Sequence, residues 1–337
     1  MINSVIHLVD DASMGGVNRL LENLENTDGG FTLDHHKIVR VKRGMAKAPK
    51  LNADVIVSHM SISWANLPFF TSLRAAHPDT PMVHVEHSYS ERFVALNVEK
   101  RARFDDLLGV CYALFDRIVA VSEPQASWLA RRKFCLSDQI VTIPSCVKLQ
   151  RCFDIRDCKP DGPLAIAAIG RLHPQKGFDI LIEAFVKLCN PEIVLQIVGD
   201  GPERSALEKI AAGNKNIIFR GAMDNIALAL AECDIVAMPS RWEPYGLVAL
   251  EAMAAGRPVL CSKVDGLNQH ISEGAIAVPE NTVAGWVTMF QSLTSREVVE
   301  RLPIGKTAIK AEWQFIHAWN SLVRKLLSED AGNQLAA

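Results

Sequence analysis

The chain has 337 residues, of which 49% are hydrophobic and 22% are charged, and its formal net charge is −2. This length exceeds the roughly 250–300 residues that a single hydrophobic core organises, so two domains are expected. The near-neutral charge offers no basic field that would hold DNA or RNA by neutralising phosphates, so nucleic acid is not expected as a partner.

The apolar run at the N-terminus is too short for a signal peptide, and no segment approaches the roughly 20 apolar residues that cross a bilayer. A cytoplasmic location is therefore expected. Most of the eight cysteines lie in apolar contexts, where a reduced cysteine behaves as a small hydrophobic residue. Cys146, Cys152 and Cys158 recur at a regular interval but lack the CxxC or Cys/His spacing of metal sites, so no metal site is expected.

Short β-branched runs alternate with helical segments along the whole chain. In the first half these runs are VIHLV, KIVRV, DVIVSH, PMVHVEH, RIVAVS and QIVTIP. In the second half they are LAIAAIG, IVLQIVG, NIIFRG, DIVAMPS and RPVLCS. Near-continuous apolar strands separated by helices predict parallel sheets covered on both faces. The fold class is therefore α/β, repeated in two domains.

A connection between the two domains is predicted in CVKLQRCFDIRDCKPDGP, which loses the periodicity and ends in Pro160, Gly162 and Pro163. The first domain is predicted over 1–155 and the second over 156–306. A closing helix is predicted over 307–327. Its apolar positions follow helical spacing and are Ile309, Trp313, Ile316, Trp319, Leu322, Val323 and Leu326.

The first loop of chemical interest, DDASMGGVNRLLENL, places Gly15 and Gly16 between a strand and an amphipathic helix. Adjacent glycines at a helix N-terminus let backbone N–H groups approach an anion, and the helix dipole favours its charge. A tight turn that packs the helix against the strand explains the same residues equally well.

The second loop, AIGRLHPQKGFDILIEAF, carries Arg171 and Lys176 between a strand that ends at Gly170 and the next helix. Two cations in such a loop suit a diphosphate, which needs charge-assisted hydrogen bonds from two directions. Taken alone, these two residues favour a simpler interpretation, a solvated loop with two surface cations.

The third loop, PSRWEPYGLVALEAMAAGRPVL, places Glu243 just ahead of a helix and Glu251 inside it. The helix is predicted to end at Gly256 and Pro258. A carboxylate accepts hydrogen bonds from vicinal hydroxyls, so two of them could hold two sugar rings with a diphosphate between them. For either acid alone, a helix-start acid or a satisfied core acid is the alternative.

The segment EPYGLVALEAMAAGRPV resembles the Glu-x7-Glu motif of the family 4 retaining glycosyltransferases, also called glycosyl transferases group 1. The resemblance extends over nearly the whole chain and is strongest over 164–280. It rests on GRLHPQKGFDILIEAF, VGDGPER, FRGAMDN, DIVAMPSRWEPYG, the N-terminal GGV and the Trp-rich terminal helix. It implies the GT-B fold, in which two Rossmann-like domains face each other across a cleft and the terminal helix joins the first domain.

The resemblance assigns roles to the third loop and the helix that follows it. Glu243 would bind hydroxyls of the donor sugar, and Glu251 would bind the ribose of the nucleotide. The phosphate end would meet the backbone at Tyr245, Gly246 and Leu247.

Further implied contacts come from the other loops. Arg171 and Lys176 would stabilise the charge that grows on the departing nucleoside diphosphate, an electrostatic role that often dominates catalysis. Gly16 would approach the same diphosphate from the other domain. The nucleotide base would lie near Arg220 and Gly221.

His87 closes PMVHVEH, and the resemblance places it beside the transferred sugar and the acceptor. A histidine that only closes the strand is the alternative. His84 lies three positions earlier, so the two rings should point to opposite faces and should not share a metal. There is no Asp-x-Asp motif, so the reaction is expected to need no metal or other cofactor.

The function implied is a retaining hexosyltransferase reaction. It would move a sugar from a nucleotide-diphosphate sugar to a glycan or lipid-linked glycan, in surface polysaccharide or glycolipid biosynthesis. Another GT-B-like enzyme, such as a sugar-nucleotide epimerase or a phosphorylase, and a non-catalytic scaffold are the alternatives. Asn18 and Arg19 follow the glycines where many relatives carry an acid, and the donor base, the sugar and the acceptor stay open.

Two basic segments, EKRARF and WLARRKF, suggest a peripheral membrane contact. Cations beside aromatic and aliphatic side chains on a helix could rest on the anionic inner leaflet. A solvated helix face is the alternative. The residues of the two segments that would make this contact are Lys100, Arg101, Arg103, Phe104, Trp128, Leu129, Arg131, Arg132, Lys133 and Phe134.

Overall fold

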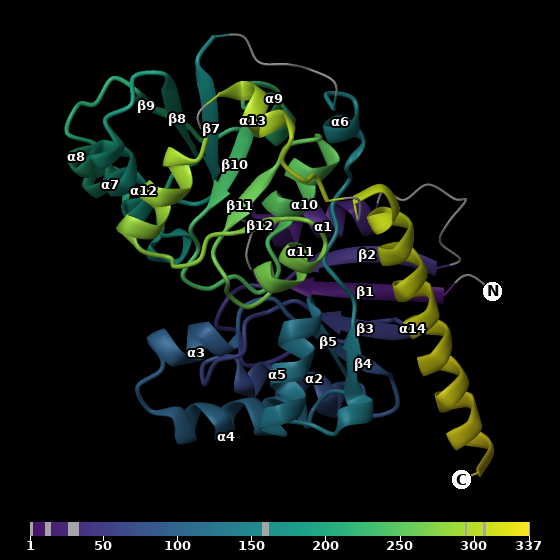
Figure 1. The fold of residues 1–337 in the computed structure, drawn as a ribbon. Helices are drawn as coiled ribbons and strands as arrows, with labels where there is room; N and C mark the ends of the chain where they lie inside the picture. Colours follow the sequence, from purple (N-terminus) through teal and green to yellow (C-terminus); the bar gives the residue numbers. More distant parts are fainter. Residues whose placement is uncertain are drawn as a thin grey trace. The chain divides into compact units, whose positions relative to one another are not determined.

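The protein, seen in a computed structural model, is described at residues 3–10, 15–25, 34–156, 162–293, 295–305 and 308–336. It divides into two compact units, and each carries its own sheet (Figure 1). Unit 1 comprises Met1–Lys148 with Ala311–Ala337, and unit 2 comprises Leu149–Lys310. The predicted α/β class is confirmed in both units.

The sheet of unit 1 is parallel and six-stranded, with the order β2-β1-β3-β4-β5-β6. Its strands are β1 (Asn3–Val9), β2 (Asp34–Arg40), β3 (Val55–Ser58), β4 (Met82–Glu86), β5 (Arg117–Ala120) and β6 (Ile140–Thr142). Its helices are α1 (Gly16–Glu25), α2 (Leu67–Ala76), α3 (Glu91–Asn97), α4 (Arg101–Tyr112), α5 (Glu123–Arg132), the 3-10 turn η1 (Ser137–Gln139) and most of α14 (Ala308–Ala336).

The core of unit 1 follows from the alternation of side chains along its strands. Ile6 and Leu8 of β1 join a cluster with apolar residues of α2, α4 and α5. His7 points to the opposite face, because successive residues of a strand alternate between faces. There its ring meets Trp319 of α14 edge-on, with the ring centres 5.7 Å apart.

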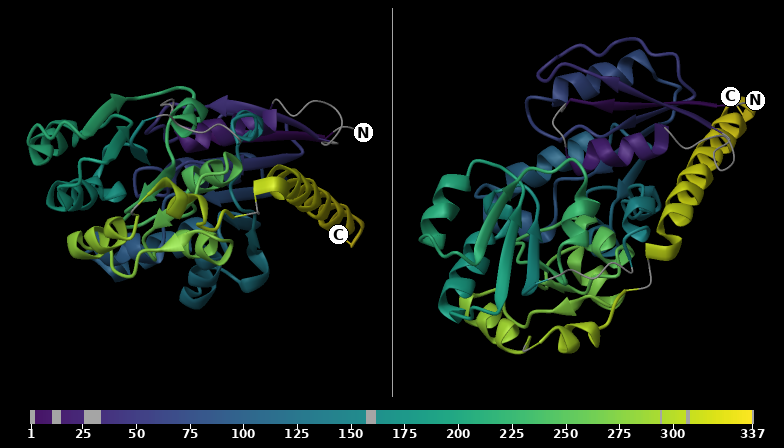
Figure 2. Two further views of the ribbon diagram at one scale, coloured as in Figure 1. Left: turned by 45° about the horizontal axis from the view of Figure 1, so that its top comes forward. Right: turned by 90° about the horizontal axis from the view of Figure 1, so that it is seen from above.

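The terminal helix α14 is one long element, drawn in yellow (Figures 1 and 2). Apolar residues at helical spacing, such as Trp319, are buried along the part of it that belongs to unit 1. Two of the apolar residues at helical spacing are not buried, since Ile309 is 64% exposed and Trp313 is 56% exposed. Both lie in the first turns of the helix, and Trp313 stacks on His317 instead.

The sheet of unit 2 is also parallel and six-stranded, with the order β12-β11-β10-β7-β8-β9. Its strands are β7 (Leu164–Ile169), β8 (Ile193–Val198), β9 (Ile217–Gly221), β10 (Ile235–Met238), β11 (Val259–Cys261) and β12 (Ile276–Ala277). Every run predicted as a strand forms one, whereas β12 was not predicted, because two residues give no pattern.

The helices of unit 2 cover both faces of its sheet. They are α6 (Gln150–Phe153), the 3-10 turn η2 (Pro174–Lys176), α7 (Phe178–Leu188), α8 (Arg204–Ala211), α9 (Ile226–Ala231), α10 (Leu247–Ala254), α11 (Leu267–Ser272), α12 (Val283–Gln291) and α13 (Arg296–Glu300). One cluster joins α7, α8, α12 and α13 to alternate strand residues such as Ile166 and Ile235. Ala167 and Val236, which alternate with them, are buried as well, and α10 contacts β10 and β11.

The division between the units, after Lys148, lies within the predicted connection but before the bound of 155/156 given to the two domains. The short helix α6 contacts α9 and α10 of unit 2. The side chain of Arg156 also donates hydrogen bonds to the carbonyl oxygens of Met253 and Ala254, each at 3.3 Å. The segment just after Lys148 therefore packs with unit 2.

Candidate functional site

In unit 2 the strand order reverses between the neighbouring strands β7 and β10. The chain continues from β7 to β8 and β9 on one side, and from β10 to β11 and β12 on the other. Open parallel sheets bind ligands outside the carboxyl ends of the strands at such a point. The loop after β7 carries Lys176, and the loop after β10 carries Glu243. Two residues that are far apart in the sequence are thus delivered to one edge of the sheet.

Lys176 and Glu243 meet there as an ion pair between Nζ and Oε2. Both side chains are largely buried, with exposed fractions of 17% and 9%. Ser240 donates a hydrogen bond from Oγ to the same carboxylate oxygen at 3.2 Å. The backbone N–H of Glu243 donates to Oδ2 of Asp265 at 3.1 Å, which fixes where the acid stands. A buried charge needs such partners, because an unpaired one is costly.

The position of Lys176 depends on the glycine that follows it. Gly177 has φ +66°, and a Cβ at this position would lie 2.2 Å from the carbonyl oxygen of Pro239, at the end of β10. Only glycine lets the two loops approach this closely. The stem of Lys176 passes over Gly170, where a Cβ would lie 3.2 Å from Cε of the lysine.

Arg171 is the second cation predicted for this loop, and it is exposed. Among the residues that the structure describes, it has no ion-pair partner. The pKa of His173 is lowered mainly by burial and, next, by the positive charge of Arg171 nearby. The neutral ring of His173 accepts a hydrogen bond from the backbone N–H of Gln175 at 3.2 Å and begins the turn that leads to Lys176.

A second ion pair ties the two loops together behind the first. The guanidinium of Arg241 donates to both carboxylate oxygens of Asp179, at 2.9 and 2.5 Å. Burial would raise the pKa of Asp179, but the hydrogen bonds and charge of Arg241 outweigh it and hold the pKa below its ordinary value. The backbone N–H of Arg241 also donates to the carbonyl of Gln175 at 2.7 Å. Sequence reasoning missed this pair, because Arg241 lies in the loop after β10 whereas Asp179 lies in the first turn of α7.

The helix α10 begins at Leu247, after Gly246 with φ +99°, as the motif predicts. The side chain of Tyr245 is buried against His270, with ring centres 4.7 Å apart, so any ligand contact by this residue would involve its backbone. Glu251 lies inside the helix and is 1% exposed. It is therefore held in the interior rather than on the surface.

Arg220 and Gly221 end β9, at the same edge of the sheet. The guanidinium of Arg220 is occupied, because it donates to Oε1 of Gln196 at 2.9 Å and to Oε2 of Glu232 at 2.6 Å. Gly221 has φ +77°, and its carbonyl accepts a hydrogen bond from the N–H of Gly199 at 2.8 Å. Any contact with a base would therefore involve the backbone here.

The remaining predicted residues belong to unit 1. Gly16 opens α1, and the carbonyl of Gly15 accepts a hydrogen bond from the N–H of Arg19 at 3.2 Å. The rest of that loop, residues 11–14, lies outside the described residues. His87 directly follows β4, also at a carboxyl edge, and is partly exposed.

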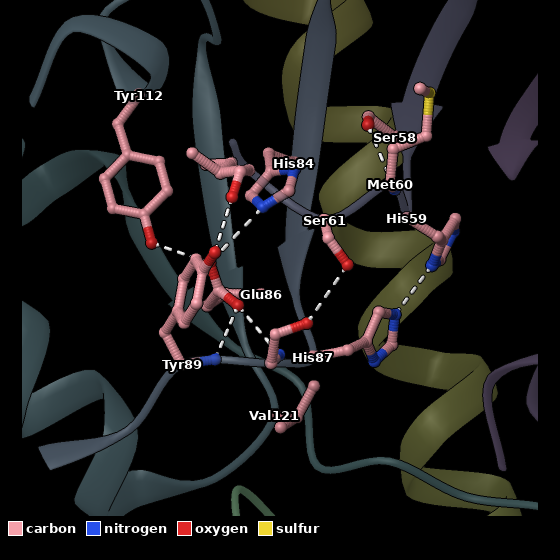
Figure 3. Close-up of polar contacts among 12 residues, drawn as sticks. Ser58, His59, Met60, Ser61, His84, Glu86, His87, Tyr89, Tyr112 and Val121 are labelled. Atoms are coloured by element: carbon pink, nitrogen blue, oxygen red, sulfur yellow. Dashed lines mark hydrogen bonds and ion pairs between the residues drawn. The ribbon is translucent and has the colours of Figure 1, made fainter. Parts of the chain in front are cut away.

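Glu86 fixes the backbone around His87 (Figure 3). Its Oε1 accepts hydrogen bonds from the N–H groups of Ser88 at 2.8 Å and Tyr89 at 2.9 Å, and its Oε2 accepts one from the hydroxyl of Tyr112 at 2.8 Å. Burial would raise the pKa of Glu86, but contact with His84 and these amides holds it below the ordinary value. The charged carboxylate therefore anchors the turn that carries His87.

His87 is also the end of a row of four hydrogen-bonded histidines. Its Nε2 lies 2.8 Å from Nδ1 of His59. Nε2 of His59 lies 2.8 Å from Nδ1 of His7, and Nε2 of His7 lies 2.8 Å from Nδ1 of His36. We call these four residues the histidine row. Sequence reasoning missed it, although three of the predicted strands carry a histidine and His36 directly precedes a fourth.

Two regions of the chain match known glycosyltransferase families. Residues 163–296 match the family described as Glycosyl transferases group 1, and residues 26–151 match Glycosyltransferase Family 4. Together the two matches cover most of both units. The chain belongs to the family 4 glycosyltransferases.

Curated relatives resemble this family 4 chain over part of their length. A sulfoquinovosyl transferase of Arabidopsis thaliana, SQD2, is 32% identical over 46% of this chain and 32% of its own. The lipopolysaccharide core biosynthesis glycosyltransferase LpsE of Rhizobium meliloti is 36% identical over 35% of each chain. The matches thus span about a third of the length of these relatives.

The similarity in fold to a solved structure covers nearly the whole chain. The structure of HepE from Anabaena in complex with UDP and glucose covers 97% of this chain and 99% of its own, with a TM-score of 0.71 and 16% identity. This comparison shows that the two proteins share the GT-B fold.

The opposite orientation of His84 and His87 is confirmed in this family 4 chain. His84 contacts Glu86 and the aromatic cluster around Tyr112, whereas His87 contacts His59 (Figure 3). Within the described parts of the chain, no group of three or more His, Cys, Asp or Glu residues is arranged to hold a metal ion.

The apolar part of the predicted membrane surface is wrong. Trp128 and Leu129 of α5 and Phe134 just after it are buried in the core of unit 1, and Phe104 of α4 packs against this core. The cations of the two segments are exposed, but two of them have acidic partners. The pairs are Arg131 with Glu91 and Arg132 with Asp105. Among the described helices, none is both long and apolar enough to cross a bilayer.

Proposed function

We propose that the protein is a retaining glycosyltransferase that moves a sugar from a nucleotide-diphosphate sugar to a glycan or lipid-linked glycan. The observation that carries this proposal is the Lys176–Glu243 pair, placed where the strand order of a family 4 chain reverses. A lysine beside a carboxylate offers a cation for a phosphate and an acceptor for sugar hydroxyls at one point.

Donor binding would break the ion pair between Lys176 and Glu243 and give each of the two side chains a new partner on the donor. Without donor, Lys176 and Glu243 neutralise each other. With donor, the ammonium group would turn to a phosphate oxygen, and the carboxylate would accept hydrogen bonds from sugar hydroxyls. The exposed Arg171 would add a second positive charge. Neither buried charge is left without a partner in either state, which keeps the exchange energetically accessible.

The other predicted residues complete the proposed donor site. Glu251 would bind the ribose, and the backbone around Gly246 at the start of α10 would bind the phosphate end, where N–H groups of a helix favour anions. The backbone at Gly221 would meet the base, and Gly15 and Gly16 would bind the diphosphate. HepE, which shares the fold, was crystallised with UDP and glucose, which supports this class of ligand.

We base the proposed acceptor on the names of two relatives. One is named for sulfoquinovosyl transfer and another for lipopolysaccharide core biosynthesis, which supports a role in surface polysaccharide or glycolipid synthesis. His87 would lie beside the transferred sugar, as the family resemblance implies.

The proposal is tested by incubating the purified protein with UDP, GDP and ADP sugars. Thermal stabilisation by one donor, with slow release of its sugar in the anomeric configuration that it has in the donor, is the expected result. Absence of both effects with every donor would contradict the proposed function.

We predict that activity survives chelation. Lys176 and Arg171 would neutralise the departing diphosphate in place of a divalent cation. Turnover in EDTA should therefore equal turnover in untreated protein, measured with the donor that the panel identifies. A complete loss of turnover in EDTA that manganese restores would overturn this part of the proposal.

We also propose that the exposed cations of α4 and α5 let the protein visit an anionic membrane surface. Because the neighbouring aromatic residues are buried, the attraction would be electrostatic and salt-sensitive, with about 1 kcal/mol for each charge near the surface. Liposomes with anionic lipid should carry the protein upward in flotation at low salt and release it at high salt. If it never floats with them, a soluble acceptor becomes the better account.

A further inference from the structure

The histidine row crosses the sheet of unit 1 diagonally. His87 and His59 follow the ends of β4 and β3, His7 lies within β1, and His36 lies near the start of the edge strand β2. Neighbouring rings are 5.1 Å apart, centre to centre, at each of the three contacts. The row therefore links the carboxyl edge of the sheet, where ligands bind in such folds, to the amino half of an edge strand.

Each contact in the row joins Nε2 of one ring to Nδ1 of the next. A neutral imidazole has one N–H and one acceptor nitrogen. The three contacts are therefore all satisfied in only two ways, with every ring protonated on Nε2 or with every ring protonated on Nδ1. A mixed arrangement would make two N–H groups or two lone pairs face each other at 2.8 Å. The four tautomers are thus coupled.

The row is unsuited to storing charge or a metal. Burial and the neighbouring histidines lower the pKa of His7 and His59 well below the ordinary value. Burial lowers the pKa of His87 to about 4, although Glu86 opposes the shift. A metal bonds to histidine nitrogen at about 2.0–2.1 Å, so it cannot fit between two nitrogens that are 2.8 Å apart. The rings of His7, His59 and His87 are therefore neutral at pH 7.

We propose that His59, His7 and His36 are positioning residues for His87, which they hold in one neutral tautomer. This inference rests on the proposed function in one respect, that His87 faces the reacting sugar and acceptor. Of the two coupled arrangements, protonation on Nε2 is the more stable form of a neutral histidine in water. It leaves Nδ1 of His87 to accept a hydrogen bond from a sugar or acceptor hydroxyl.

The far end of the row is closed to water. Nε2 of His36 is buried and the residue is 5% exposed, so a proton taken up at His87 could not leave the row there. The row therefore acts by fixing which nitrogen of His87 carries the hydrogen, because the hydrogen bond of one ring nitrogen decides the role of the other.

Nitrogen NMR of protein labelled in its histidine rings tests the coupling directly. At pH 7 the four rings of the row should be neutral and protonated on Nε2. In His7→Phe, which keeps an aromatic ring against Trp319, the signals of His59 and His87 should show mixed tautomers. A cationic His87 in the wild type, or an unchanged tautomer in His7→Phe, would overturn the proposal.

A second variant tests the far end of the row. In His36→Gln the side-chain oxygen can still accept a hydrogen bond from Nε2 of His7, so His87 should keep the tautomer of the wild type. A changed tautomer of His87 in His36→Gln would contradict the proposed alignment. His35→Gln is the matched control, because His35 is the exposed neighbour on the same strand, and it should also leave the tautomer of His87 unchanged.

The NMR readout separates this inference from the proposed function. It does not depend on turnover, so it decides the coupling of the row even if no nucleotide sugar is a substrate. If the protein transfers sugar but His7→Phe leaves the tautomers of His59 and His87 unchanged, the coupling is refuted while the glycosyltransferase assignment stands.

Discussion

Replacing either member of the Lys176–Glu243 pair should lower turnover at saturating donor by at least about tenfold, because one charge-assisted contact in a transition state is worth roughly 1.5–3 kcal/mol. Lys176→Ala removes the cation proposed to stabilise the departing diphosphate. Glu243→Gln keeps the shape of the side chain and removes the charge that accepts hydrogen bonds from the sugar. Initial rates with the identified donor measure both effects.

The matched controls lie on α7, which follows the same loop. Lys187→Ala and Glu183→Gln remove the same charges from exposed positions, so both should retain wild-type rates. Circular dichroism should show that all four variants keep their secondary structure. Wild-type rates in both Lys176→Ala and Glu243→Gln would show that the pair only joins two loops and would contradict the site.

Gly177→Ala should destabilise unit 2 by about 2–4 kcal/mol and reduce activity with it. The added Cβ would lie 2.2 Å from the carbonyl oxygen of Pro239, which is backbone and cannot rotate away. The loops after β7 and β10 would have to separate, which would pull Lys176 from Glu243. Urea denaturation measures the loss of stability, and donor turnover measures the loss of alignment.

Gly213 provides a control with nearly the same backbone conformation. Its φ is +71°, close to the +66° of Gly177, but a Cβ there would meet nothing within 4 Å. Gly213→Ala should therefore cost only the left-handed strain of alanine, about 1 kcal/mol, and keep full activity. Equal losses of stability in the two variants would mean that the close approach of the loops contributes nothing.

The sequence was sufficient for the strands, the donor-site motif and the family, because these depend on local patterns. The apolar runs predicted every long strand, and the glycine and proline after α10 predicted its end. The Glu-x7-Glu spacing correctly placed Glu243 before a helix and Glu251 within it. The spacing within single loops also singled out Lys176 as a candidate cation.

Features that depend on pairing between strands were beyond the reach of local patterns. The contact between Lys176 and Glu243 needs β7 and β10 to be neighbours, and this follows from the strand order rather than from either loop. The histidine row needs the register of four strands as well as the alternation along each. Trp128 was wrongly predicted to face a membrane for the same reason. The sequence of a helix with several cations does not show which of its faces packs against the sheet.

The central claim, that Lys176 and Glu243 mark a nucleoside diphosphate site, is tested most directly by calorimetric binding of nucleoside diphosphates and monophosphates. For the matching base, the wild type should bind the diphosphate about 10 to 100 times more tightly than the monophosphate. In Lys176→Ala this preference should largely disappear, while the affinity for the monophosphate changes little. Equal affinity for the two nucleotides in the wild type, or an unchanged preference in Lys176→Ala, would contradict the account.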